Sequence, residues 1–202
     1  MNNEHRARHY LIAILFAVFF PPLMILLHEL GHYSAGRLLG YSPILSYAEV
    51  SVFQPMNRTH DFLFALAGPC VDLVFCVLGV TGLLRLGRSL PTHRCWEVWL
   101  WSAFAISGFR WIKIPFDGVQ SDEGGMSALL GFHHLLIPLA LLPPAAVAVG
   151  ILIRFHLRNH TLLPYAASFV ASALSVLVWF TLLGPALLPI PIRDSSGASG
   201  TP

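Results

Sequence analysis

The chain has 202 residues, of which 55% are hydrophobic and 11% are charged, and its formal net charge is +2. Soluble domains carry roughly a quarter charged residues, so this composition excludes an ordinary soluble domain and predicts an integral membrane protein. The basic residues stand singly along the chain and form no run, which argues against nucleic acid as a partner.

Five stretches approach the roughly 20 apolar residues that a membrane-spanning helix needs. They cover residues 10–36, 62–84, 96–113, 135–153 and 163–184. The third is the weakest, because only twelve residues separate the charged Glu97 and Arg110. The fourth contains Pro143 and Pro144, which we expect to kink or break it.

These spans predict an all-α integral membrane protein with about five transmembrane helices, in which residues 10–190 form a single polytopic domain. Residues 1–9 form a polar N-terminal segment. We interpret the apolar run after it as a retained helix, because no small-residue cleavage pattern follows. Residues 191–202 are small and polar, a composition typical of a disordered tail.

Two connections between the spans are long enough to carry structure of their own, residues 41–60 and 114–127. Within the first, the stretch "SYAEVSVF" alternates polar and apolar residues. Such alternation is typical of a strand with two different faces. We therefore expect a short β-strand or hairpin after the first helix.

The motif "HELGH" at residues 28–32 ends the first apolar run. Residues four apart on a helix differ by about 40° in direction, so His28 and His32 project from one face and can hold one metal ion. Zinc suits imidazole ligands better than magnesium or calcium do. Glu29 is the candidate general base for a water molecule activated by that metal. Ionisable groups near membrane depth are costly and usually functional.

A catalytic zinc usually has three protein ligands and one open position, and HELGH supplies two. Position 38 is Leu38, which excludes the third histidine of a metzincin. If residues 62–84 and 96–113 both cross the bilayer, the loop 114–127 returns to the face on which HELGH ends. That loop offers Asp117, Asp122 and Glu123 as candidates.

The motifs "HELGHYSAGRLLGY", "LAGPCVDL" and "IPFDGVQSDEGGMSALLG" follow one another in this order. Together they resemble the site-2 protease family of intramembrane zinc metalloproteases, over about residues 15–135, with a catalytic core at about 10–135. The resemblance implies one Zn²⁺ per chain, bound by His28, His32 and an aspartate that precedes a helix. Asp122 is the first choice for that aspartate, because an apolar run follows it at the family's distance, and Asp117 is the second.

Two positions depart from the family's pattern. Ile112 stands where an Asn-x-x-Pro segment would have its asparagine, and Asp72 replaces the asparagine usual in "GPxxN". Asp72 is a candidate for positioning substrate, and a hydrogen bond between helices is an equally good interpretation. We expect Gly68 and Pro69 to permit close packing beside the HELGH helix.

The resemblance implies an endopeptidase that cuts membrane-anchored protein substrates within the lipid bilayer and that can depend on a separate regulatory partner. A substrate helix must be extended before cleavage, and the edge formed by "SYAEVSVF" could hold it by β-augmentation. Two alternatives stay open: a non-catalytic membrane relative that binds partners or metal, and a transporter subunit whose histidines and carboxylates line an ion path.

The basic residues are shared unequally between the two sides of the membrane. In the five-span arrangement, seven Lys and Arg residues lie on the N-terminal side and five on the side where HELGH ends. The positive-inside rule then places the N-terminus in the cytoplasm. The family commonly has its site toward the cytoplasm instead, so the two criteria give opposite orientations.

Overall fold

The computed structural model describes residues 3–85, 122–158 and 162–188. In chain order the elements are α1 (Asn3–Leu38), β1 (Ile44–Leu45), β2 (Val50–Ser51), α2 (Arg58–Arg85), α5 (Asp122–Leu129), α6 (Leu136–Arg158), α7 (Leu162–Val178), the π-helix η3 (Trp179–Leu183) and α8 (Gly184–Leu187). The described part of the chain is thus mostly helical with a small two-stranded sheet, as the sequence predicts.

Three helical segments are long and apolar enough to cross a membrane: Ile14–Leu38, Arg58–Arg85 and Phe169–Leu187. They correspond to the first, second and fifth predicted spans. The fourth predicted span forms α6, and the third, residues 96–113, lies outside the described residues. A helical protein with membrane-spanning segments is therefore supported, while the number of five spans stays a prediction.

The structure differs from the sequence predictions in several element boundaries; α1, for example, begins at Asn3 within the segment 1–9 that the sequence predicts to precede it. α6 continues through Pro143 and Pro144, so these prolines do not break it. Adjacent prolines disturb the backbone hydrogen bonds of one turn only, and helices in apolar surroundings tolerate such a loss. Residues 122–127, which the sequence assigns to a loop, belong to helix α5.

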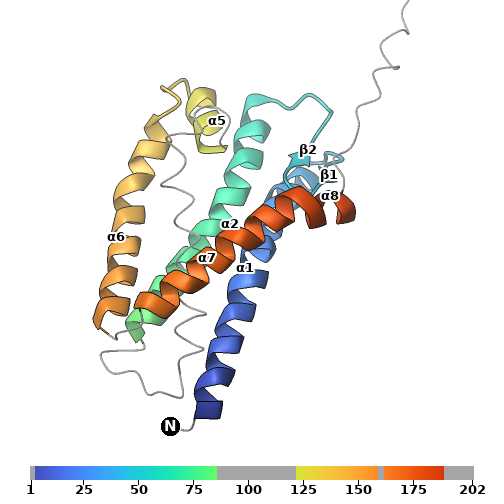
Figure 1. Cartoon of the computed structure of the whole chain (residues 1–202). Coiled ribbons are helices and arrows are strands. Elements are labelled where there is room, and N and C mark those ends of the chain that lie inside the picture. The colour runs from blue at the N-terminus through green and yellow to red at the C-terminus, as the bar shows by residue number, and fades with distance from the viewer. Residues whose placement is uncertain (1–2, 86–121, 159–161, 189–202) are drawn as a thin grey trace, which may run out of the picture.

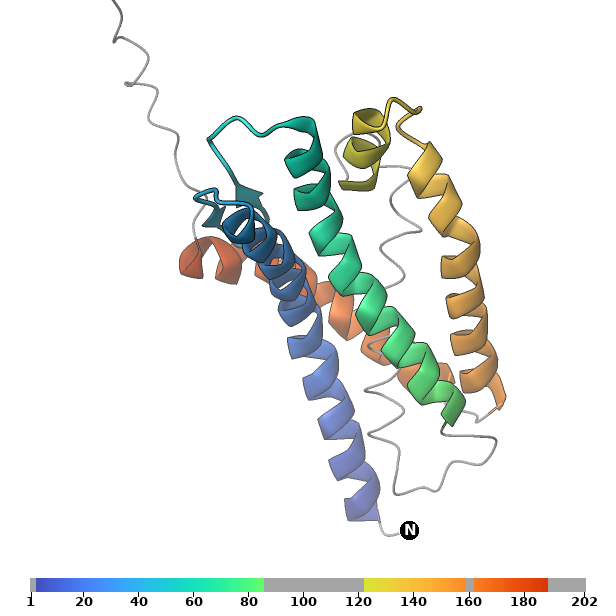
Figure 2. The same cartoon turned by 180° about the vertical axis from the view of Figure 1, so that it is seen from behind.

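The helices α1 and α2 run side by side, α6 lies on the far side of α2, and α7 crosses α1 obliquely (Figures 1 and 2). Two serines of α7 join it to α1: the Ser172 hydroxyl donates to the Ala17 carbonyl at 2.8 Å, and the Ser175 hydroxyl donates to the Val18 carbonyl. Hydroxyl groups are common helix contacts where the surroundings are apolar.

Polarity is distributed in the reverse of a soluble protein's pattern. Large apolar side chains face outward, among them Phe19 on α1 and Leu84 on α2, at 70% and 63% exposure. Among the side chains of α1 and α2 whose burial the structure describes, the buried polar ones are those of His28, Glu29, His32 and Asp72. Apolar exteriors suit contact with lipid, and the polar groups inside are costly there unless they are paired or functional.

The strands β1 and β2 form an antiparallel hairpin, with Ile44 opposite Ser51 and Leu45 opposite Val50. This confirms a hairpin after the first helix, although β1 begins before the stretch "SYAEVSVF" that predicted it. Ser46 at the turn is fully buried; its hydroxyl donates to the Glu49 carbonyl at 2.8 Å and accepts from the Glu49 N–H at 3.1 Å. Local bonds of this kind favour a turn over a longer strand.

The hairpin turn is also tied to the C-terminal helical segment. The Tyr47 N–H donates to the Leu188 carbonyl at 3.1 Å, and the Trp179 indole N–H donates to the Tyr47 carbonyl at 3.1 Å. Trp179 begins the π-helix η3, a geometry that occurs mostly as a local feature and frequently at functional sites. The end of the fifth predicted span thus fixes the turn that follows the first helix.

Candidate metal centre

Helix α1 presents the two histidines of HELGH on one face, as their spacing predicts. His28 and His32 are buried, with 3% and 4% of their surfaces exposed. Their Nε2 atoms lie 3.0 Å apart, and the two rings meet edge to face. The imidazoles therefore converge on one point next to α2.

Asp122, the first residue of α5, approaches the same point. Its Oδ2 atom lies 3.1 Å from Nε2 of His28 and 3.4 Å from Nε2 of His32. The potential ligand atoms of the three residues all lie within 4.8 Å of one another, and the Asp122 side chain is 27% exposed. This group can hold a metal ion, and its partly exposed carboxylate leaves one side accessible.

Contacts further along α5 set the position of Asp122. The Ser127 hydroxyl donates to the Glu123 carbonyl and accepts from the Ile137 N–H at 3.1 Å, which joins α5 to the start of α6. Two residues beyond Ser127, at the last residue of α5, the Arg58 guanidinium of α2 donates to the Leu129 carbonyl. The short helix is thus held from two sides.

The outer nitrogen of each imidazole has a defined hydrogen-bond acceptor. Nδ1 of His32 lies 2.7 Å from the Phe64 carbonyl oxygen, and Nδ1 of His28 lies 3.0 Å from Oδ2 of Asp72. A carbonyl or carboxylate only accepts, so both Nδ1 atoms carry the hydrogen. In the neutral imidazoles, both Nε2 atoms then present lone pairs toward each other and toward Asp122.

Three acceptor atoms that face one another at 3.0–3.4 Å repel unless a cation or a proton lies between them. Two ligands bound to zinc at 2.0–2.1 Å with a tetrahedral angle lie roughly 3.3–3.4 Å apart. The donor set and its spacing therefore fit a small tetrahedral cation with the fourth position open.

Helix α2 comes close to this point because residue 68 is glycine. A Cβ atom on Gly68 would lie 2.3 Å from Nε2 of His32 and 2.4 Å from Nε2 of His28. On the facing helix α1, a Cβ atom on Gly31 would lie 2.9 Å from the Ala67 carbonyl oxygen. Gly68 thus has the packing role that the sequence predicts. Because it has no side chain, the Nε2 atoms of both histidines can lie next to its Cα atom.

The remaining predicted site residues have different outcomes. Glu29 is buried, at 8% exposure, beside His28 on α1. Asp117 lies outside the described residues. Asp72, predicted to position substrate or to bond between helices, contacts His28 across the α1–α2 interface. Sequence reasoning missed the Phe64 carbonyl, because a backbone group carries no sequence signal.

No protein-family model, curated protein or solved structure matches this chain.

Proposed function

We propose that this protein is an intramembrane zinc metalloendopeptidase of the site-2 protease type, which cuts membrane-anchored protein substrates. The observation that carries the proposal is the convergence of His28 Nε2, His32 Nε2 and Asp122 Oδ2 between apolar helices. Such a cluster is costly in these surroundings. A bound metal ion would offset this cost by interacting with all three ligand atoms.

Zinc is the proposed metal, because two imidazole nitrogens and one carboxylate oxygen form a common catalytic zinc site with an open position. His28, His32 and Asp122 are the proposed ligands, with Asp117 as the second choice for the carboxylate. Zinc bound there supplies Lewis acidity, which lowers the pKa of water toward about 7.

Glu29 is the proposed general base. It follows His28 directly in HELGH and is buried. In the proposed reaction its carboxylate takes a proton from the attacking water and returns it to the leaving amine. Burial shields that proton transfer from bulk solvent.

The proposed substrate is a transmembrane segment held in extended form. A helix hides its peptide bonds in its own hydrogen bonds, so the segment must unwind before water can attack. Within the described residues, β1 and β2 form a sheet of two strands, and an edge of such a sheet can pair with an extended peptide. The Tyr47 contacts with Trp179 and Leu188 hold this hairpin in place.

The test is zinc content and cleavage of a model transmembrane substrate by purified protein in detergent. We expect wild type to bind one zinc ion and to cut, and Glu29→Gln to bind zinc without cutting. Asp122→Ala should lose both zinc and activity, whereas Asp117→Ala should keep them. His133→Ala, which removes an exposed histidine, is the matched control and should behave as wild type.

Other outcomes separate the alternative functions. Wild type that binds zinc but never cuts would favour a non-catalytic relative. Ion flux into liposomes that depends on His28 and Asp122, without cleavage, would favour a transporter subunit. Zinc loss in Asp117→Ala but not in Asp122→Ala would overturn the ligand set.

A further inference from the structure

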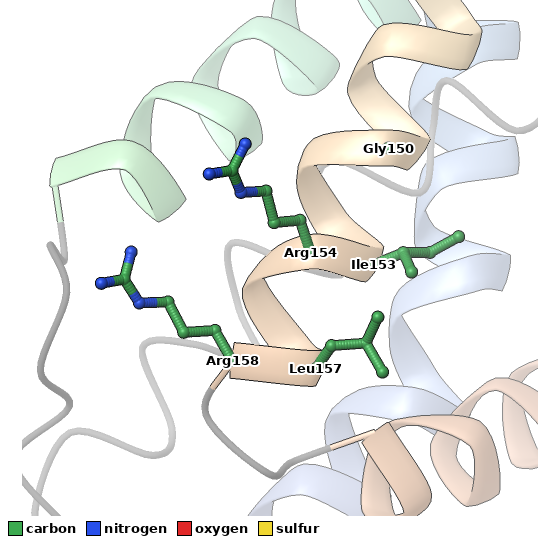
Figure 3. A pocket seen from close by; sticks show the side chains of 5 residues that line it. All are labelled: Gly150, Ile153, Arg154, Leu157 and Arg158. Atoms are coloured by element: carbon green, nitrogen blue, oxygen red, sulfur yellow. The ribbon is translucent and has the colours of Figure 1, made fainter.

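The C-terminal end of α6 carries a recess remote from the metal centre in the sequence. It has a volume of about 790 Å³, and its described lining residues are Gly150, Ile153, Arg154, Leu157 and Arg158. Figure 3 shows Arg154 and Arg158 extending toward one side of α6 and Ile153 and Leu157 extending toward the other side in this view, and all of these residues line the same recess. The recess thus combines two cations with an apolar rim.

Both guanidinium groups are free of partners among the residues that the structure describes. Arg154 and Arg158 are exposed, and neither makes an ion pair or a hydrogen bond with another described residue. They stand four residues apart, so they follow one another on one face of the helix. A guanidinium offers donors in a planar fork that matches two phosphate oxygens.

The glycine of the recess keeps it open. Gly150 stands four residues before Arg154 on the same face, and a Cβ atom built on it would meet nothing within 4 Å. A bulky side chain at this position would project into the space beside the guanidinium groups. Beside them, Ile153 and Leu157 are 45% and 55% exposed. The recess can therefore accept a group that is partly apolar.

The recess also lies at a suitable depth. Arg154 and Arg158 follow directly after the predicted span 135–153, as expected of residues at the end of a membrane helix. Figures 1 and 2 show the end of α6 at the same end of the molecule as the start of α1 and the end of α2, which is Arg85. This end carries the larger share of basic residues in the five-span arrangement.

We propose that this recess binds the phosphate headgroup of an anionic phospholipid, with Arg154 and Arg158 on the phosphate and with Ile153 and Leu157 against its glycerol and upper acyl region. An acidic soluble peptide would match the charges but not the exposed apolar side chains beside them. A membrane lipid matches both features. The proposal does not depend on the proteolytic function.

The experiment titrates purified full-length protein in detergent with phosphatidylglycerol, or with phosphatidylcholine of the same acyl chains, and counts bound lipid by native mass spectrometry. We expect phosphatidylglycerol to bind more tightly. Arg154→Gln and Arg158→Gln should each weaken its binding about five-fold, with little change for phosphatidylcholine. Arg154→Lys should lose less, because it keeps the charge but not the fork.

Two controls distinguish the recess from general surface charge. Arg37→Gln removes an exposed basic residue from α1 at the other end of the molecule, and it should leave phosphatidylglycerol binding unchanged. Gly150→Leu keeps both arginines but fills the recess, and it should weaken binding as strongly as loss of an arginine.

Equal binding of the two lipids would overturn the proposal, as would an equal loss in Arg37→Gln and Arg154→Gln. Displacement of the lipid by inorganic phosphate at comparable concentration would show that the recess binds a free anion, which also overturns the choice of a lipid. Wild-type binding in Gly150→Leu would place the lipid elsewhere on the surface.

Discussion

Nδ1 of His28 on α1 lies 3.0 Å from Oδ2 of Asp72 on α2, and both side chains are at least 94% buried. A carboxylate in this position orients the imidazole, fixes its tautomer and makes Nε2 a stronger donor to a metal. The contact with His28 therefore favours an orienting role for Asp72 at the proposed metal centre.

The first prediction concerns Asp72. Asp72→Ala removes the acceptor for the His28 Nδ1–H, so zinc affinity should fall by about 10- to 100-fold. Asp72→Asn keeps an amide oxygen that can accept the bond, and its loss should be smaller. Zinc dissociation constants from competition with a chelating dye measure both. Asp61→Asn, in the first turn of α2, is the matched control. Unchanged zinc affinity in Asp72→Ala would contradict the orienting role.

The second prediction concerns Gly68. A methyl group at this position would overlap Nε2 of both histidines, so Gly68→Ala should abolish zinc binding although it adds only one carbon atom. Gly125→Ala is the matched control on α5, because a Cβ atom on Gly125 would meet nothing within 4 Å. Zinc content by elemental analysis measures the effect. Size-exclusion chromatography separates loss of zinc from loss of fold, and normal zinc content in folded Gly68→Ala would refute the prediction.

Parts of the site follow from local sequence and parts do not. The spacing of His28 and His32 fixes their common face, because the helix repeat relates them directly. The contact of Asp72 with His28 depends on how α1 is placed against α2, and that placement is set by Gly31 and Gly68, 37 residues apart. The hydrophobic periodicity of each helix does not show how two helices that are distant in the sequence pack against each other.

The same distinction holds for the fold. Apolar length predicts α1, α2, α6 and α7, because each must satisfy its own backbone hydrogen bonds in an apolar environment. The exact start of β1 depends on the hydrogen bonds of Ser46, and the π-helix η3 adjoins the packing of Gly184 against Tyr47. The Ser46 bonds are local ones to Glu49 that an alternating pattern does not reveal, whereas the contact of Gly184 with Tyr47 forms only when the chain is assembled.

The third prediction concerns the connection between the hairpin and the C-terminal segment. Trp179→Phe keeps an aromatic ring but removes the N–H that donates to the Tyr47 carbonyl. Loss of one hydrogen bond should lower the free energy of local opening by about 1 kcal/mol. Amide exchange through that opening should then be about five-fold faster. Hydrogen–deuterium exchange of a peptide covering residues 44–51 measures it.

Thr181→Ala is the control for this prediction. The Thr181 hydroxyl lies in the same π-helix, but it donates to the Leu177 carbonyl of the adjoining helix α7 and makes no bond to the hairpin turn. Its loss should leave exchange in the hairpin unchanged. Equal acceleration in both variants would indicate general weakening of the C-terminal segment rather than loss of the Tyr47 contact.

The fourth prediction concerns stability and needs no substrate. Zinc bound by the folded state alone stabilises it by about 2.7 kcal/mol when free zinc is a hundred times the dissociation constant. A chelator should therefore lower the melting temperature of wild type, and readdition of zinc should restore it. Protons compete with zinc for the two imidazoles, so the stabilisation should shrink on acidification.

Two variants should differ in how their melting temperatures respond to zinc. Asp122→Ala removes one of three converging ligand atoms and relieves the crowding of acceptors, so its melting temperature should barely respond to zinc or chelator. Glu29→Gln leaves all three ligand atoms in place, so it should respond as wild type does. An equal response of the melting temperature to zinc in wild type and Asp122→Ala would mean that the ion binds elsewhere. Loss of this response in Glu29→Gln would mean that Glu29 is a zinc ligand and not a base beside the ion.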